Sequence, residues 1–173
     1  MWPKPENEDS NFFRLPSVHI PMPIGKIDDY PVLAACLEAW RPTAANGFPQ
    51  SIDPLDMPPA AIKAISLVEW SDEHGDWVLR LSSTLIDESH GRSMRGTTFS
   101  EAFVPEDLAK VHARLNEIMQ RGEPDLGQHE FYDTRDRVWS FVRLILPLSS
   151  DGVKRDRYCL IYDPETFGRR IGT

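Results

Sequence analysis

A single long amphipathic segment, residues 105–121, lies in the middle of the chain between two groups of strand-like segments. Pro105 opens it at a position where a missing N–H costs nothing, and Glu106 and Asp107 complement the positive end of a helix dipole. Apolar residues recur along it at helical spacing and form one stripe: Leu108, Val111, Leu115, Ile118 and Met119. Such a helix must bury this stripe, and the flanking strands are predicted to supply the surface.

Five segments of the chain read as β-strands, two before this helix and three after it. Loops with turn residues separate them. They span residues 65–70, 77–82, 126–132, 138–148 and 157–162. Two strands, a helical excursion and three further strands predict an α+β fold. We expect a five-stranded antiparallel sheet with helices packed on one face, preceded by an N-terminal helix.

Two short helical pieces are expected between the first hairpin and the long helix. Residues 84–90 form the first, which stops at Gly91 because glycine readily adopts the left-handed conformation that ends many helices. The second begins at Thr98, and Glu101 three residues later completes the pattern of a capping box.

The chain divides into three parts by composition. Residues 1–30 are rich in proline and are expected to be largely irregular, although the apolar piece at residues 12–20 should pack on the domain or on a second copy. Residues 31–163 form the domain, including its N-terminal helix. Residues 164–173 are expected to be a short tail without regular structure.

Charge and apolar patterning exclude several classes of partner. The chain has 27 acidic and 19 basic residues, and the resulting net charge of −8 repels the phosphate backbone, so no nucleic-acid partner is expected. No apolar run approaches the roughly 20 residues that span a bilayer, and the N-terminus lacks a secretory pattern, so a cytoplasmic location is expected. Cys36 and Cys159 are isolated, lie in apolar patterns and are expected to be buried thiols.

Several short fragments occur in an order that resembles a stand-alone bacterial PAS-domain family, formerly catalogued as a domain of unknown function. The resemblance spans about residues 32–163. The fragments are Trp40, Ile52-Asp53-Pro54, Leu67, Arg80-Leu81 with Thr84, Gly91 followed by Arg95-Gly96, and Leu146-Pro147-Leu148-Ser149 before Asp151-Gly152. The resemblance implies a non-catalytic sensory or regulatory module. Such a module acts in signal transduction through small-ligand binding, protein–protein contact or both.

The resemblance also implies where a ligand would bind. In PAS domains the first hairpin and the last three strands share one sheet, and the helices cover a pocket on it. Aromatic and aliphatic residues on the inner face of the sheet and on the long helix are therefore the pocket candidates: Leu79, Leu81, Phe103, Met119, Phe131, Trp139 and Phe141.

Two arginines are the candidates for polar contacts with a ligand. Arg80 and Arg143 each lie within an otherwise apolar strand, where a guanidinium needs a carboxylate, phosphate or water partner. One of them could reach an anionic ligand or the carboxylate of a partner. Alternatively, they face outward or pair with Asp53 or Glu69.

Dimerisation is a further implication of the resemblance, because PAS domains commonly associate through the segment before the first strand. Pro31 opens a helix there, and Leu33, Leu37 and Trp40 recur along it at positions i, i+4 and i+7. These three residues are the dimer-interface candidates. With no output domain in the sequence, a homodimer would pass its signal to a protein partner.

The sequence requires no cofactor and carries no catalytic motif. Some PAS domains hold haem through a helix histidine, for which His112 is the best match, but it sits beside the apolar stripe and reads as a boundary residue. No second metal ligand stands at i+3 or i+4 from it. Neither cysteine has the neighbours of a flavin-reactive cysteine, and no nucleophile elbow or phosphate loop is present. We therefore expect neither haem, flavin nor metal, and no enzyme activity.

Two other functions remain open at this point. A structural adaptor would have the same fold with a filled core and no ligand. A small cone-shaped enzyme of the ketosteroid-isomerase kind would also combine helices with a curved sheet, but it would need a buried Asp or Tyr acid–base pair, and its longer helices come first. An empty pocket would distinguish a ligand-binding module from the adaptor, and the groups that line the pocket would distinguish a ligand-binding module from the enzyme.

Overall fold

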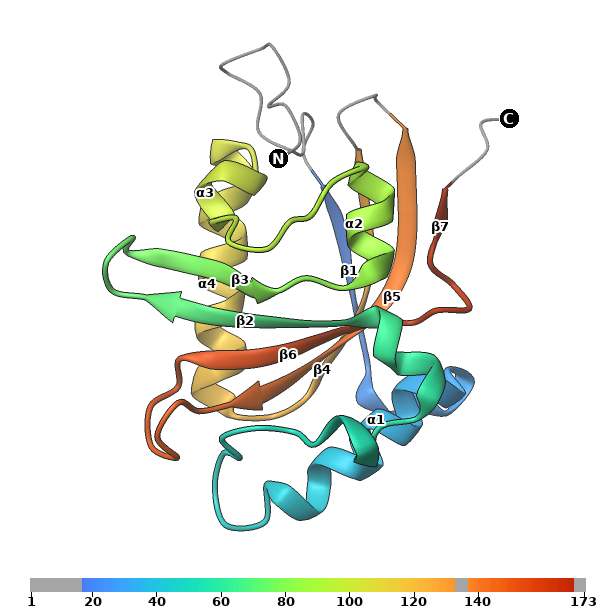
Figure 1. Ribbon diagram of the computed structural model, residues 1–173, viewed down its shortest axis with the longest axis vertical. Coiled ribbons are helices and arrows are strands. Elements are labelled where there is room, and N and C mark those ends of the chain that lie inside the picture. Colours follow the sequence, from blue (N-terminus) through green and yellow to red (C-terminus); the bar gives the residue numbers. More distant parts are fainter. Residues whose placement is uncertain (1–16, 133–136, 170–173) are drawn as a thin grey trace.

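The computed structural model describes residues 17–132 and 137–169 of the 173-residue chain. The α+β architecture expected from the sequence is confirmed (Figure 1). The strands are β1 (Val18–Met22), β2 (Ile65–Ser71), β3 (Asp76–Leu81), β4 (Asp125–Tyr132), β5 (Val138–Leu148), β6 (Arg157–Tyr162) and β7 (Gly168–Arg169). The helices are α1 (Pro31–Thr43), α2 (Thr84–His90), α3 (Phe99–Ala102) and α4 (Pro105–Arg121), with short 3₁₀ turns η1 (Ile24–Asp29), η2 (Pro54–Asp56) and η3 (Pro59–Ala64).

The sheet is antiparallel and larger than expected. Its main path has six strands in the order β1-β4-β5-β6-β2-β3, and β7 pairs with the start of β5. The five expected strands all form, but the count of five is wrong because part of the proline-rich segment adds β1 at one edge of the sheet. An edge strand tolerates Pro21, since its outer side has no ladder hydrogen bond to lose. Residues 12–16 of the expected apolar piece lie outside the described residues.

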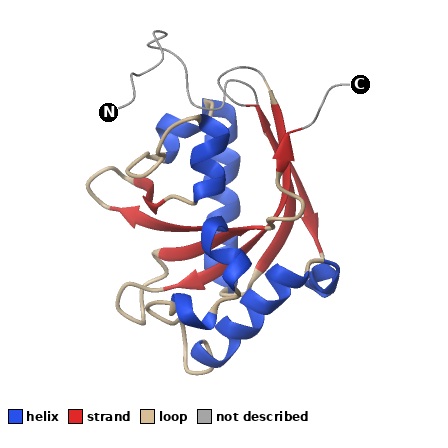
Figure 2. Ribbon diagram, turned by 45° about the vertical axis from the view of Figure 1, so that its right-hand side comes forward, coloured by secondary structure: helices blue, strands red, loops and turns tan. Residues whose placement is uncertain are grey.

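Helices cover both faces of the sheet, which corrects the expectation of helices on one face (Figure 2). Side chains of β5 alternate between the two layers. Val142 and Leu144 face α1, whereas Phe141 and Ile145 face the helices α2–α4. The long helix α4 passes behind β2, β3 and β6 in Figure 1.

The apolar stripe of α1 packs on the sheet of its own chain. Leu33, Leu37 and Trp40 are 0, 1 and 6% exposed, and the Trp40 indole donates a hydrogen bond to the Pro147 carbonyl at 2.9 Å. The assignment of these residues to a dimer interface is therefore wrong. The stripe correctly predicts that the helix buries one face, but the surface that receives it is β4–β6 of the same molecule.

Local signals at the helix ends are confirmed. Thr98 and Glu101 form a reciprocal capping box at α3, and Gly91 ends α2 in the left-handed conformation with φ 68°. Cys36 and Cys159 are both buried free thiols. The expected irregular tail instead contributes β7, and Phe167 packs against Phe141 with ring centroids 5.2 Å apart. No helix in the described part of the chain is long and apolar enough to cross a membrane.

Candidate ligand-binding site

A cavity of about 500 Å³ lies between the sheet and helices α2–α4. Its floor consists of side chains from β4, β5 and β6, its roof comes from α3 and α4, and β1 closes one side. The apolar part of the wall comprises Val18, Ile86, Phe99, Phe103, Val111, Leu115, Phe131, Phe141, Ile145 and Leu160. Such a volume is within the range of about 300–1,000 Å³ that is usual for small-molecule sites.

Aromatic rings form much of this wall. Phe131 and Phe141 on the floor are 5.8 Å apart between ring centroids, and Phe99 and Phe103 in the roof are 5.2 Å apart. Both pairs have the edge-to-face geometry that aromatic rings favour. The pocket therefore offers flat, rigid apolar surfaces on its floor and its roof.

A buried ion-pair cluster lies at the polar end of the pocket. Asp125, the first residue of β4, accepts hydrogen bonds through Oδ2 from Arg143 Nη1 at 3.0 Å and from Arg114 Nη2 at 3.3 Å. Arg121 Nη2 lies 3.5 Å from its Oδ1. Burial alone would raise the pKa of Asp125, but Arg143 and Arg114 outweigh it and hold the pKa below its ordinary value. Arg143 and Arg114 line the cavity.

Two histidines face each other beside this cluster. His19 on β1 and His129 on β4 are register partners, and their ring centroids are 5.9 Å apart. Burial and then the positive charge of Arg143 lower the pKa of each to about 3, so both imidazoles are neutral near pH 7. The Nε2 atom of His19 is buried and has no hydrogen-bond partner within the described part of the chain.

A glycine makes room for His19. A Cβ atom on Gly127 would come within 2.4 Å of His19 Cε1, so only glycine leaves the imidazole its position over β4. Gly127 is also the register partner of Arg143. The absence of one side chain thus brings His19 next to the buried guanidinium.

The edge strand β1 is fastened to α4 across the pocket. Ser17 donates from both its backbone N–H and its hydroxyl to Asp107 Oδ2, the latter at 2.9 Å. Asp107 is itself buried. The segment before the first helix therefore closes one wall of the cavity and connects the sheet edge to the roof.

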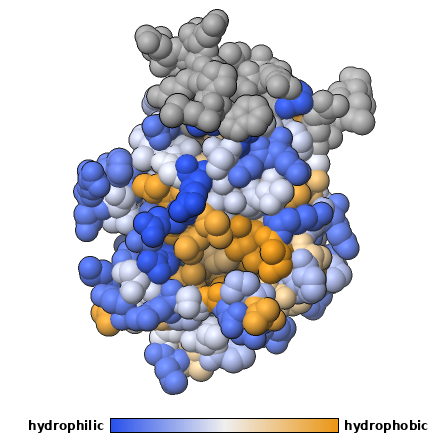
Figure 3. All heavy atoms as spheres, viewed as in Figure 1, coloured by the Kyte–Doolittle hydropathy of each residue, from blue (hydrophilic) through white to orange (hydrophobic). Residues whose placement is uncertain are grey.

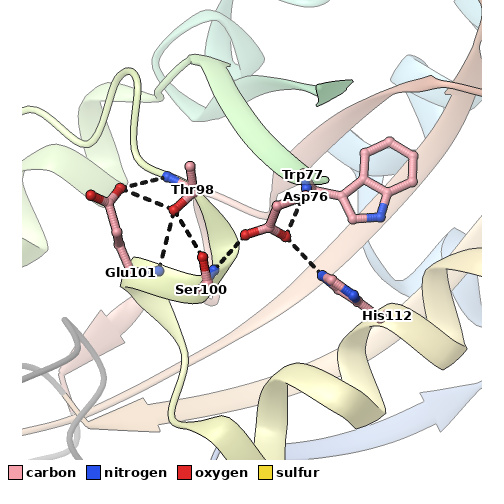
Figure 4. Close-up of polar contacts among 6 residues, drawn as sticks. All are labelled: Asp76, Trp77, Thr98, Ser100, Glu101 and His112. Carbon is pink, nitrogen blue, oxygen red and sulfur yellow. Dashed lines mark hydrogen bonds and ion pairs between the residues drawn. The ribbon is translucent and has the colours of Figure 1, made fainter. Parts of the chain in front are cut away.

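The roof is held to the hairpin β2–β3 by Asp76 (Figure 4). Its Oδ1 lies 2.8 Å from His112 Nε2 on α4 and accepts from the Trp77 N–H, and its Oδ2 accepts from the Ser100 N–H of α3 at 2.7 Å. Burial opposes ionisation of Asp76, but the hydrogen bonds led by Ser100 lower its pKa below the ordinary value. The Asp76 carboxylate lies between the Ser100 backbone N–H and the His112 imidazole. This arrangement fastens the roof and does not pair a nucleophile with a base.

His112 therefore has a structural partner and does not line the cavity. Among the described residues, no group of three His, Cys, Asp or Glu side chains could hold a metal ion.

Sequence reasoning found part of the pocket. Phe103, Phe131, Phe141 and Arg143 line it as expected. The other aliphatic and aromatic candidates are placed elsewhere: Leu79 and Met119 are buried in the adjoining core, and Trp139 stacks on Phe131 and packs against Phe167 without lining the cavity.

Leu81 and Arg80 are displaced from the pocket by a β-bulge. Leu67 pairs with Leu81 but Val68 pairs with Leu79, so Arg80 is the extra residue of β3. The extra residue moves Leu81 to the α1 side of the sheet, where it is 52% exposed. Arg80 is solvent-exposed, and its Nε lies 3.7 Å from a Glu69 carboxylate oxygen, as in the outward-facing alternative.

Sequence reasoning placed Arg143 at the pocket but missed the other residues of its polar end. Arg114 reads as an ordinary charged residue on the polar side of α4, and His19 lies in a segment expected to be irregular. His129 lies two residues before Phe131 on β4, so the two side chains share one face of the strand. This spacing is the one signal that could have placed His129 on the pocket side.

A second feature lies on the other side of the molecule from α4. Figure 3, seen from the same direction as Figure 1, shows apolar side chains gathered around a hollow over β2 and β6. Large hydrophobic side chains exposed on the neighbouring elements include Leu81 on β3 and Ile62 on η3. Contiguous apolar surface of this kind is typical of protein contact sites.

No profile of a known protein family matches this chain, and no curated protein is similar to it. Its function is therefore inferred from the geometry of the pocket.

Proposed function

We propose that this protein is a non-catalytic PAS-type sensory or regulatory module that binds a small ligand in the pocket under α3 and α4. The observation that carries the proposal is a cavity of about 500 Å³ whose apolar wall contains the buried guanidinium of Arg143. The arrangement of the fold supports it. The hairpin β2–β3 shares one sheet with β4, β5 and β6, and α2–α4 cover the pocket, as the PAS resemblance implies.

The cavity favours a ligand-binding module over a ligand-free adaptor. The pocket opens to solvent, so its apolar wall meets water when nothing occupies it. An adaptor with a filled core would have no such exposed wall, and the buried arginine in the wall adds a desolvation cost. A bound ligand would cover the apolar wall and contact the guanidinium, and so offset both costs.

The charges in the pocket argue against a ketosteroid-isomerase-like enzyme. Such an enzyme needs a carboxylate that acts as a base, and its activity depends on a suitably high pKa. Asp125 contacts the floor residue Arg143, and its pKa is held low by Arg143 and Arg114. The lining carboxylate of Asp107 accepts two hydrogen bonds from Ser17. Burial raises the pKa of the pocket residue Tyr162, so its neutral phenol does not supply a base in place of Asp125.

Output is proposed to pass through protein contacts of a homodimer in the cytoplasm. Because the apolar stripe of α1 is buried on its own sheet, Leu33, Leu37 and Trp40 do not supply the dimer or partner contacts. The apolar hollow over β2 and β6 is the contact site that we favour (Figure 3). Ligand binding on one face of the sheet would then be reported by a contact on the other face.

Native mass spectrometry of the purified protein tests the proposal together with a pocket-filling variant. Val111 lines the cavity from α4, so Val111→Trp should fill it, whereas Ala113→Trp places the same bulk on the exposed side of the helix. We expect wild type and Ala113→Trp to retain a small molecule, or to bind members of a fragment collection, and Val111→Trp to bind none. If all three proteins show the bare polypeptide mass and none binds a fragment, the ligand-free adaptor is favoured.

A further inference from the structure

We propose that the ligand is an organic monocarboxylate with a flat apolar body, and that Arg143 and Arg114 bind its carboxylate. This inference rests on the proposed function, because it concerns the occupant of the same pocket. It assigns a chemical class from three observations: the balance of charge at the polar end, the donors that lack partners there, and the aromatic wall.

The charge balance at the polar end calls for one negative charge. Arg143 and Arg114 both contact the same oxygen of Asp125, and both line the cavity. Arg121 pairs with the other oxygen of Asp125 from outside the cavity, and its charge is screened because the side chain is about half exposed to solvent. The lining also contains Asp107 and Lys110, one charge of each sign, so the two lining arginines and Asp125 leave about one positive charge without a carboxylate partner. A buried unpaired charge is costly, and a monoanion removes that cost.

The hydrogen-bond donors at this end are incompletely used. Within the described residues, Arg143 donates only through Nη1, although a guanidinium carries five N–H donors. Among the described residues, the Nε of Arg114 is buried without a hydrogen-bond partner, and so is Nε2 of His19, which is a donor in one of the two neutral tautomers. Buried donors in proteins are nearly always paired. A carboxylate accepts several hydrogen bonds, and its planar shape matches the guanidinium fork.

The rest of the wall selects the body of the ligand. Beyond the polar end, the lining is dominated by Phe99, Phe103, Phe131 and Phe141 together with Ile145 and Leu160. Aromatic walls on the floor and in the roof accept a flat ring between them. A small hydrophilic acid such as acetate would leave these walls uncovered, so the class is an amphipathic acid with one or two rings.

Isothermal titration calorimetry with 1-naphthylacetate and its uncharged isostere 1-naphthylacetamide tests the assignment on the full chain. The two probes differ only in the charged group. We expect the acid to bind about ten- to one-hundred-fold more tightly, the range typical of a hydrogen-bonded charge pair. The third probe, 1-naphthyl phosphate, carries a second charge and should bind no more tightly than the acid.

Two variants with a shared partner locate the effect. Arg114 and Arg121 both pair with Asp125, but only Arg114 lines the cavity. Arg114→Gln should remove most of the preference for the acid over the amide, and Arg121→Gln should keep it. Each variant leaves Asp125 with two arginine partners, so both are expected to fold.

The outcomes separate the ligand class from the proposed function. Equal binding of acid and amide, abolished by Val111→Trp, would overturn the monocarboxylate and leave a ligand-binding pocket in place. Tighter binding of the phosphate would overturn it in favour of a dianion. No binding of any naphthyl probe would also overturn it, and native mass spectrometry would then decide whether the pocket binds a ligand at all.

Discussion

At the scale of single residues, Asp125 is the side chain on which the pocket depends most. It is the counter-charge of Arg143, whose side chain is only 8% exposed. Asp125→Asn leaves that guanidinium buried without a carboxylate, and removing one partner of a buried ion pair costs about 3–5 kcal/mol. Urea unfolding of wild type and variant measures this loss.

Arg121 provides the matched control for Asp125. It pairs with the same carboxylate but is about half exposed, at 48%. Exposed ion pairs contribute about 0–1 kcal/mol, so Arg121→Gln should change the free energy of unfolding by less than about 1 kcal/mol. If Asp125→Asn costs no more than Arg121→Gln, Arg143 does not depend on Asp125.

The two pocket histidines predict how stability varies with pH. Burial and Arg143 lower the pKa of His19 and His129 to about 3, whereas an unfolded histidine titrates near 6.5. Between these values the unfolded state binds more protons than the folded state, so stability falls as the pH decreases from about 6.5 towards 3. The lowered pKa of Asp125 affects stability only below about pH 5, where an unfolded aspartate begins to bind protons, which leaves the upper part of the window to the histidines.

Urea unfolding at pH 7, 6 and 5 checks this prediction. His129→Gln keeps a polar side chain and removes one titrating group, so its free energy of unfolding should fall less steeply with acidification than that of wild type. Parallel curves for the two proteins would show that His129 does not contribute.

At the scale of elements, α1 is predicted to stabilise the monomer. Leu37 is fully buried between α1 and the sheet, so Leu37→Ala should cost about 2–5 kcal/mol. This loss should be the same at every protein concentration, because unfolding of a residue buried within one chain does not involve a second copy. Glu38→Ala, one residue along on the exposed face, is the control and should have little effect. A loss that grows on dilution would place Leu37 in an interface instead.

Elements defined by local chemistry were predictable from the sequence, and those defined by distant partners were not. Pro105 and the capping box at Thr98 determine helix starts through groups a few residues away, and both were found. The apolar stripe of α1 correctly predicted a buried face, but no local signal says which surface receives it. The strand β1 and the bulge at Arg80 depend on register with β4 and β2, so the sequence pattern alone misplaced them.

The same distinction explains which parts of the site were found. Phe141 and Arg143 are two residues apart on β5 and therefore lie on one face of the strand. The sequence predicts this without knowledge of the neighbouring strands. The polar end needs β1, β4 and α4 together, because His19, Asp125 and Arg114 come from three separate elements. Only the assembled fold brings these residues next to Arg143.

At the scale of the whole molecule, β1 belongs to the segment before α1 and also forms part of the pocket wall. Gly127 on β4 leaves the space in which β1 and its His19 side chain pack. Gly127→Ala places a methyl group where the His19 ring lies, and the neighbouring Ile20 carbonyl is 3.3 Å from the new Cβ. The ring and the strand must both shift, so β1 should separate more readily from β4. We expect amide hydrogen exchange across residues 18–22 to become about ten-fold faster, while exchange in β5 and β6 changes little.

Gly25→Ala is the matched control, because nothing lies within 4 Å of a Cβ at that position of the same segment. It should leave exchange in β1 unchanged. Because Val18 and His19 form part of the pocket wall, Gly127→Ala should also weaken binding of 1-naphthylacetate, and saturating ligand should slow the exchange of β1 in wild type. Slower exchange in β1 on binding would mean that pocket occupancy is communicated to the N-terminal segment. Unchanged exchange would mean that β1 is a static wall, and that a ligand signal leaves the molecule through the roof or the sheet.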